Sequence, residues 1–131
     1  MATSKVTVNF PCPVEQVWRT VTDLTHTAWR SDLARVEVLD EAHFVEHTKS
    51  GYATGFTVTA CEPLRRWAFT MANGNMSGFW EGIFETAEGG TQLTCTETVN
   101  AKHWWMRPFV SGYLRRQQRL YLDDLRRELQ K

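Results

Sequence analysis

Residues 5–21, which read KVTVNFPCPVEQVWRTV, change their hydrophobic period partway along. Val6 and Val8 alternate with polar residues, and this alternation predicts a half-buried strand over residues 5–10. Two prolines then interrupt the pattern. Over residues 14–21 the apolar positions recur every three or four residues, which predicts a short amphipathic helix. The chain therefore opens with a strand that leads directly into a helix.

The middle of the chain alternates short β-forming runs with turn residues. Residues 25–32 are expected to form a loop or a second short helix. Beyond them, turn signals such as Asn73-Gly74-Asn75 separate the β-forming runs. The predicted strands lie near residues 35–39, 43–48, 52–61, 64–72, 78–86 and 91–99. Connections this short cannot hold a parallel crossover, so we expect an antiparallel meander, which with the first strand makes a sheet of about seven strands.

The carboxy-terminal part of the chain returns to helical spacing. The apolar stripe of this predicted helix consists of Met106, Val110, Leu114, Tyr121 and Leu125. Gln117 lies inside the stripe, and the helix is expected to lay its apolar face on the sheet. The sequence contains no internal repeat, linker or low-complexity segment, so residues 1–131 are expected to form a single domain.

Composition and charge exclude several classes of partner. The 131 residues are 42% apolar, enough for one continuous core, and 15 basic residues balance 15 acidic ones, so no net field attracts nucleic acid. No apolar run reaches the roughly 18 residues of a membrane span, and the amino terminus lacks the apolar core of a signal peptide. We therefore expect a soluble, cytoplasmic protein without membrane insertion. Three cysteines without paired spacing argue against disulfides and against a thiolate zinc site.

Individual motifs do not indicate a metal, a cofactor or nucleic acid. His43 and His47 would lie about 13 Å apart on a strand, too far to share a metal ion. Ser111 lacks the flanking glycines of a hydrolase elbow, and no phosphate-binding loop is present. The basic run over residues 115–119 is expected to be a solvated helix face with acidic partners nearby. We expect no metal, no cofactor and no nucleic-acid partner.

The order of predicted elements resembles the helix-grip fold of the SRPBCC superfamily, which includes START-like lipid-transport proteins and polyketide cyclases and dehydrases. The residues that carry the resemblance are Pro13-Val14-Glu15-Gln16-Val17-Trp18, Asp23, Trp29, Gly51, Pro63, Trp67 and Gly90-Thr91. The first of these are similar to the superfamily's opening motif, a proline-started helix with a tryptophan, followed by an aspartate and a second tryptophan. The resemblance implies an α+β fold with two short helices after the first strand. In this fold a curved antiparallel sheet wraps around the long carboxy-terminal helix and encloses a deep cavity.

Alternation along the predicted strands selects the residues that would face such a cavity. The apolar face of the sheet carries Phe56, Trp67, Phe69, Met71, Trp80 and Phe84. The long helix would contribute Tyr113, Gln117 and Tyr121. The neutral amide of Gln117 indicates either a polar cavity wall or a lone buried amide bonded to the backbone or to a tyrosine. Together with Glu97, these residues are the candidate ligand-binding set.

Glu97 breaks the apolar pattern of the last predicted strand, because it shares its face with Leu93, Cys95 and Val99. A carboxylate in that register is costly to bury unless it is paired or wetted, so Glu97 is a candidate for binding or proton transfer. The alternative is that it reaches solvent near the strand end or pairs with an arginine. Glu46 is a weaker candidate, because its strand has no cleanly apolar face.

Three functions are compatible with the sequence. The leading hypothesis is a small-molecule binding protein whose cavity holds a hydrophobic ligand of lipid, aromatic or polyketide-like type. The second is an enzyme of the cyclase, dehydratase or hydrolase type that uses Glu97 or Glu46 as its acid–base residue. The third is an interaction or regulatory protein that uses the same fold without a ligand.

Overall fold

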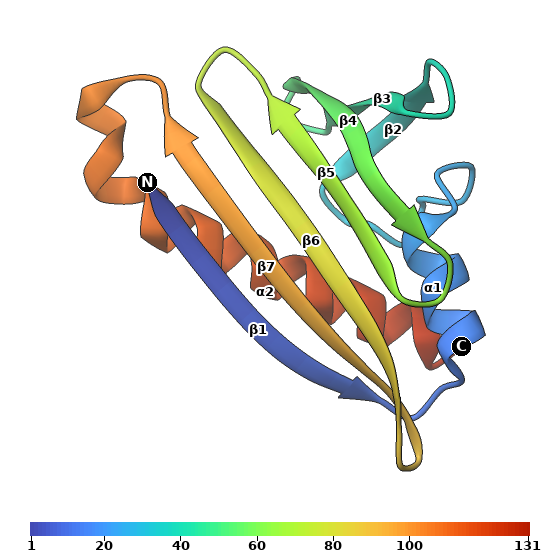
Figure 1. Cartoon of the computed structure of the whole chain (residues 1–131). Coiled ribbons are helices and arrows are strands. Elements are labelled where there is room, and N and C mark those ends of the chain that lie inside the picture. The colour runs from blue at the N-terminus through green and yellow to red at the C-terminus, as the bar shows by residue number, and fades with distance from the viewer.

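The computed structural model describes residues 1–131 as seven strands, two α-helices and one short 3-10 helix. In chain order these are β1 (Ala2–Phe10), α1 (Val14–Thr22), β2 (Leu33–Val38), β3 (His43–Thr48), β4 (Ala53–Glu62), β5 (Arg66–Ala72), β6 (Met76–Ala87), β7 (Gly90–Ala101), the 3-10 helix η1 (Trp104–Met106) and α2 (Arg107–Leu129). The strands form one sheet in the order β1-β7-β6-β5-β4-β3-β2, and all neighbours are antiparallel (Figure 1). The predicted α+β class, the seven-stranded meander and the long carboxy-terminal helix are confirmed, and the strand ends differ from the predicted ones by a few residues.

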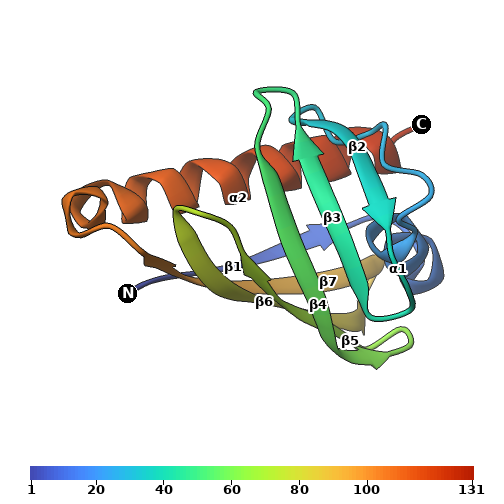
Figure 2. The ribbon, with the colours of Figure 1, turned by 90° about the horizontal axis from the view of Figure 1, so that it is seen from above.

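The sheet and α2 form two layers that touch along only part of their surface. Helix α2 packs mainly on β1 and β7. Figure 2 shows α2 lying lengthwise over the sheet, with β2, β3 and β4 crossing its direction. Because β3, β4 and β5 pack little against α2, the interior between them and the helix is not closed by backbone contact. No helix of the protein combines the length and the hydropathy of a membrane-spanning segment.

The junction between β1 and α1 is fixed against the start of β7. A Cβ atom at Gly90 would lie 2.0 Å from the carbonyl oxygen of Phe10, so only glycine lets the two backbones approach this closely. The buried hydroxyl of Thr91 donates a hydrogen bond to the carbonyl of Cys12, at 2.7 Å. These contacts hold the first strand beside the last one and direct the chain into α1.

The second short helix expected after α1 is absent, and residues 24–32 form turns instead. Two carboxylates bond backbone N–H groups that a helix would otherwise use. Asp23 accepts from the N–H of Thr25 at 3.0 Å, and Asp124 on α2 accepts from the N–H of Ser31 at 2.8 Å. Side chains that compete for the backbone in this way favour turns over helix, which explains the difference.

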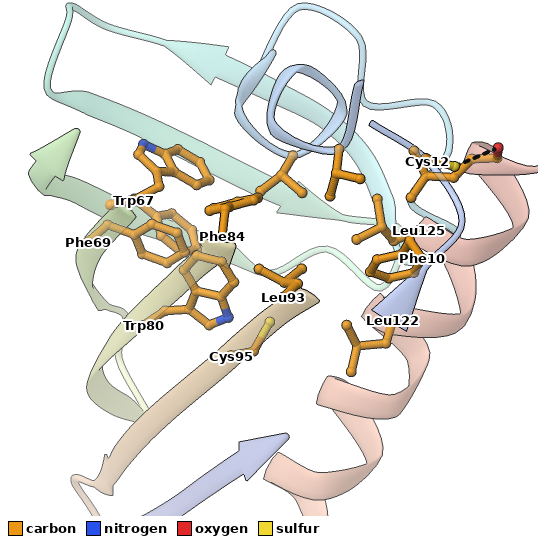
Figure 3. Close-up of a cluster of buried hydrophobic side chains, with 14 of the residues drawn as sticks. Phe10, Cys12, Trp67, Phe69, Trp80, Phe84, Leu93, Cys95, Leu122 and Leu125 are labelled. Atoms are coloured by element: carbon orange, nitrogen blue, oxygen red, sulfur yellow. Dashed lines mark hydrogen bonds between the residues drawn. The ribbon is translucent and has the colours of Figure 1, made fainter. Parts of the chain in front are cut away.

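The hydrophobic core lies toward the end of the sheet that α1 covers. Figure 3 shows Phe10, Leu122 and Leu125 on one side of this cluster and the rings of Phe69 and Trp80 on the other. A second, smaller cluster of Val99, Val110 and Leu114 packs where α2 begins. The core is therefore split between the two ends of α2.

Candidate functional site

A cavity of about 780 Å³ lies between α2 and the concave face of the sheet. It is lined by residues of α1 and the turns after it, of strands β3 to β7, and of η1 and α2. Nineteen of its 35 lining residues are hydrophobic. Both the size and the mainly apolar lining are typical of small-molecule sites.

Five rings from the sheet form one packed wall of the cavity, which we call the aromatic wall. Its members are Phe44, Phe56, Trp67, Phe69 and Trp80. The rings of Phe44 and Phe56 stack with centroids 4.7 Å apart, and those of Phe69 and Trp80 stack at 5.1 Å. Because each ring contacts others of the set, the wall is stiff and keeps its shape.

The indole of Trp80 lies over Gly82, the next residue on the same face of β6. A Cβ atom at Gly82 would come within 2.6 Å of the Trp80 ring. The same ring stacks on Phe69, and the absence of a side chain at Gly82 leaves room for it. Glycine at this position therefore allows Trp80 to take its place in the aromatic wall.

The structure places most of the sheet residues predicted for the ligand-binding set in the cavity lining. Phe56, Trp67, Phe69, Met71 and Trp80 all line it. Phe84 does not, because its ring is 2% exposed and packs edge-on against Trp18 of α1, with centroids 4.9 Å apart. Alternation assigned Phe84 to the correct face, but at its position along β6 that face is covered by α1.

The helix residues of the predicted set, Tyr113, Gln117 and Tyr121, also line the cavity. The fully buried amide, however, is the next residue, Gln118, which is 3% exposed. It accepts a hydrogen bond from the Ser4 hydroxyl at 2.6 Å and donates to the carbonyls of Ser4 and Cys95. Gln118 lies four residues after Leu114 and four residues before Leu122. This helical spacing was the signal in the sequence that the Gln118 amide faces the interior.

An ionic cluster lines the cavity beside α2. The guanidinium of Arg30 donates to Asp32 at 3.3 Å and to Glu46 at 3.4 Å. It also lies over the ring of Tyr121, 4.9 Å from the centroid. Burial raises the pKa of Glu46, and the attraction of Arg30 opposes this shift. The sequence left open an arginine partner for Glu97, whereas in the structure it is Glu46 that pairs with an arginine. Arg30 is a cavity residue that the sequence analysis did not assign.

Glu97 lines the same cavity from β7 and has a different environment. Its neighbours on this face, Cys95 and Val99, are 1% and 2% exposed, so the carboxyl group enters an apolar surface. It makes no hydrogen bond or ion pair with another side chain. Burial, together with the negative charge of Glu46, raises the pKa of Glu97 from 4.5 to about 7, while Arg30 acts in the opposite direction. Glu97 is thus a carboxyl group that changes charge near neutral pH inside the cavity.

The mouth of the cavity is marked by its exposed lining residues, Lys49, Tyr52, Trp105, Phe109 and Tyr113. Figure 1 shows the β5–β6 loop and the chain between β7 and α2 at the same end of the sheet. Trp105 lines the mouth and is 58% exposed, Trp29 lines the cavity, and Trp104 does not line it. The indole N–H of Trp29 is buried without a hydrogen-bond partner.

A family model described as polyketide cyclase / dehydrase and lipid transport matches residues 1–130. No curated protein sequence matches the chain. Among solved structures, a START superfamily protein from Mycobacterium smegmatis is similar with a TM-score of 0.85 and 12% identity, over 99% of this chain and 98% of that one. A protein from Mesorhizobium loti is similar with a TM-score of 0.82 and 17% identity, over 98% and 96%.

A third solved structure, a putative protein in the dynemicin biosynthetic locus, has a TM-score of 0.76 and 20% identity to this chain. The match covers 100% of this chain and 48% of that one. At identities this low, the three structures show a shared fold and nothing finer.

Proposed function

Because the chain belongs to the polyketide cyclase, dehydrase and lipid-transport family, we propose that it binds a hydrophobic small molecule between the sheet and α2. The ligand is of lipid, aromatic or polyketide-like type. The observation that carries this proposal is the cavity of about 780 Å³, which is lined by the aromatic wall and by the ionic cluster. Protein interiors are normally packed without voids of this size, so the volume is typical of a binding cavity and not of an ordinary hydrophobic core.

Native mass spectrometry of freshly purified protein tests the proposal directly. We expect a fraction of the protein to carry a bound small molecule, which is released and identified after denaturation. Protein that stays free of ligand when offered a panel of aromatic and aliphatic compounds would contradict the proposal.

Two phenylalanines of the same sheet face give a matched test of the site. Phe69 lines the cavity and Phe84 is packed against α1, and both are buried. We expect Phe69→Leu to weaken binding of a hydrophobic probe by roughly fivefold, through lost ring contact. Phe84→Leu should lower the melting temperature and leave the affinity unchanged. Equal effects of the two substitutions on affinity would argue against binding at the aromatic wall.

A second candidate function is acid–base catalysis on the bound ligand, and the observation that favours it is the raised pKa of Glu97. A carboxyl group with a pKa of about 7 is protonated in a large fraction of molecules at neutral pH, so it can both donate and accept a proton. Conversion of a bound compound, followed by mass spectrometry and abolished in Glu97→Gln while binding persists, would establish this function. Binding without conversion across the panel would leave only the binding function.

A further inference from the structure

The part of the cavity lining around Arg30 holds more acidic than basic groups. Three carboxylates, Asp32, Glu46 and Glu97, line the cavity there with one guanidinium, that of Arg30. Arg30 divides its donors between Asp32 and Glu46, so both of these carboxylates have a cationic partner. Glu97 has none. An unpaired carboxyl group in an apolar wall becomes neutral by taking up a proton, and a cation supplied by a ligand would instead stabilise its charged form.

The basic groups at the mouth do not fill this role. Lys49 and Arg116 also line the cavity, and the backbone N–H of Lys49 donates to the carbonyl of Asp32 at 3.0 Å. The side chains of both residues are exposed to water, and neither forms an ion pair with a cavity carboxylate, so solvent screens their charges.

Aromatic rings lie in the cavity wall on the side of Glu97. Trp80 is the cross-strand partner of Glu97 in the β6–β7 register. The rings of Trp80 and Tyr121 lie 6.1 Å apart, and those of Trp29 and Tyr121 lie 5.4 Å apart. The negative faces of such rings attract cations, and Arg30 already makes this contact with Tyr121. A carboxylate beside aromatic rings is a combination that suits an ammonium group on an apolar body.

We infer that the ligand of this cavity carries a protonated amine, held by Glu97, on a hydrophobic body that packs against the aromatic wall. This inference rests on the proposed function and narrows its ligand class to hydrophobic amines. The ammonium donates hydrogen bonds to the Glu97 carboxylate, and no covalent step is involved.

The titration of Glu97 gives the inference a second signature. The titratable groups that act on it or respond to it come from the α1–β2 turns (Arg30), from β3 (Glu46), from β7 (Cys95) and from α2 (Tyr113, Tyr121). In the empty cavity Glu97 takes up a proton below pH 7, whereas the bound ammonium favours its charged form. Binding of the amine at about pH 6 therefore releases a proton, and affinity for the amine rises with pH up to about neutrality.

The test compares probes that differ only in an amine or a hydroxyl group: 2-(1-naphthyl)ethylamine with 2-(1-naphthyl)ethanol, and decylamine with decanol. At about pH 8.5 we expect each amine to bind about tenfold tighter than its alcohol, as for a charge-assisted hydrogen bond. Calorimetry at about pH 6 in two buffers of different ionisation enthalpy should detect proton release with the amines only.

Variants assign the effect to Glu97. Glu97→Gln should remove the amine preference while the alcohols bind as before, and Glu97→Asp, which keeps the charge, should retain part of it. Glu85→Gln removes an exposed carboxylate of β6 outside the cavity lining and should change neither. Equal binding of amine and alcohol by the wild-type protein would overturn the inference and leave the proposed function standing. Failure of every probe to bind would overturn both, and the wild-type comparison remains decisive if a variant does not fold.

Discussion

Glu97 makes the stability of this protein depend on pH in an unusual direction. Its pKa is raised from 4.5 to about 7 in the folded state by burial and by Glu46, so between these values the folded chain holds a proton that the unfolded chain has lost. Stability is therefore fully present below about pH 4.5 and is lost as pH rises through about 7. A shift of this size corresponds to about 3 kcal/mol. We expect the free energy of unfolding of wild-type protein, minus that of Glu97→Gln, to fall by this amount from pH 4 to pH 8.

Urea denaturation at several pH values measures this difference, because ionisable groups that do not interact with Glu97 contribute equally to both proteins. Glu97→Leu should be more stable than wild type above pH 7, since it removes a buried charge that has no partner. A wild-type curve parallel to that of Glu97→Gln would show that the carboxylate is well solvated in the folded state. Destabilisation by Glu97→Leu at every pH would reveal a partner for this group.

At the scale of elements, one carboxylate joins the turns after α1 to the long helix. Asp124 of α2 is 1% exposed and accepts hydrogen bonds from both the N–H and the hydroxyl of Ser31, each at 2.8 Å, and it also pairs with Arg127. The two residues that flank Ser31, Arg30 and Asp32, belong to the ionic cluster of the cavity. Asp124 thus positions the cluster without touching the cavity.

We expect Asp124→Ala to lower the free energy of unfolding by about 1–3 kcal/mol, because a backbone N–H loses its only acceptor in a part-buried position. Hydrogen exchange at the Ser31 amide should become faster. Asp123→Ala, at the exposed neighbouring position, is the control and should change stability by less than about 0.5 kcal/mol. Unchanged exchange at Ser31 in Asp124→Ala would mean that other contacts hold the turns.

Alanine substitutions at two glycines are expected to change the free energy of unfolding in opposite directions. A Cβ at Gly82 would collide with the Trp80 ring, which is held by Phe69, so Gly82→Ala should cost about 1–3 kcal/mol and weaken ligand binding by displacing the aromatic wall. Gly112 lies within α2 with no atom near its Cβ direction, so Gly112→Ala should stabilise by up to about 1 kcal/mol. Denaturation curves of both variants check these signs, and a neutral Gly82→Ala would show that Trp80 moves freely.

The sequence predicted the elements well, because alternation and helical spacing report which face of each element is apolar. It was wrong about a second short helix, since the acceptor that holds Ser31 comes from a residue 93 positions away. It placed Phe84 in the cavity because alternation identifies a face and not what covers each point along it. The ion pair between Arg30 and Glu46 forms because β3 lies against the turns before β2. No local sequence pattern predicts this contact.

At the scale of the whole molecule, much of the apolar surface lines an internal cavity. The free energy of unfolding should therefore depend on whether a ligand fills that cavity. A ligand that binds only the folded state adds about 2.7 kcal/mol at a concentration one hundred times its Kd. For a chain of 131 residues we expect the melting temperature to rise by about 5–10 °C with the tightest probe at that concentration. Thermal melts over a concentration series measure the rise. A compound proved to occupy the cavity that leaves the melting temperature constant would show that the unfolded chain binds it equally.

The distribution of the tryptophans makes the protein its own optical sensor. Trp29, Trp67 and Trp80 line the cavity, whereas Trp104 is 78% exposed and lies outside it. Indole fluorescence shifts to longer wavelength in water, and dissolved iodide quenches only the rings that it can reach. A compound that enters the cavity alters the short-wavelength emission of Trp29, Trp67 and Trp80, and iodide quenches the emission of Trp104. The filling of the cavity can therefore be followed by the light that the unlabelled protein emits.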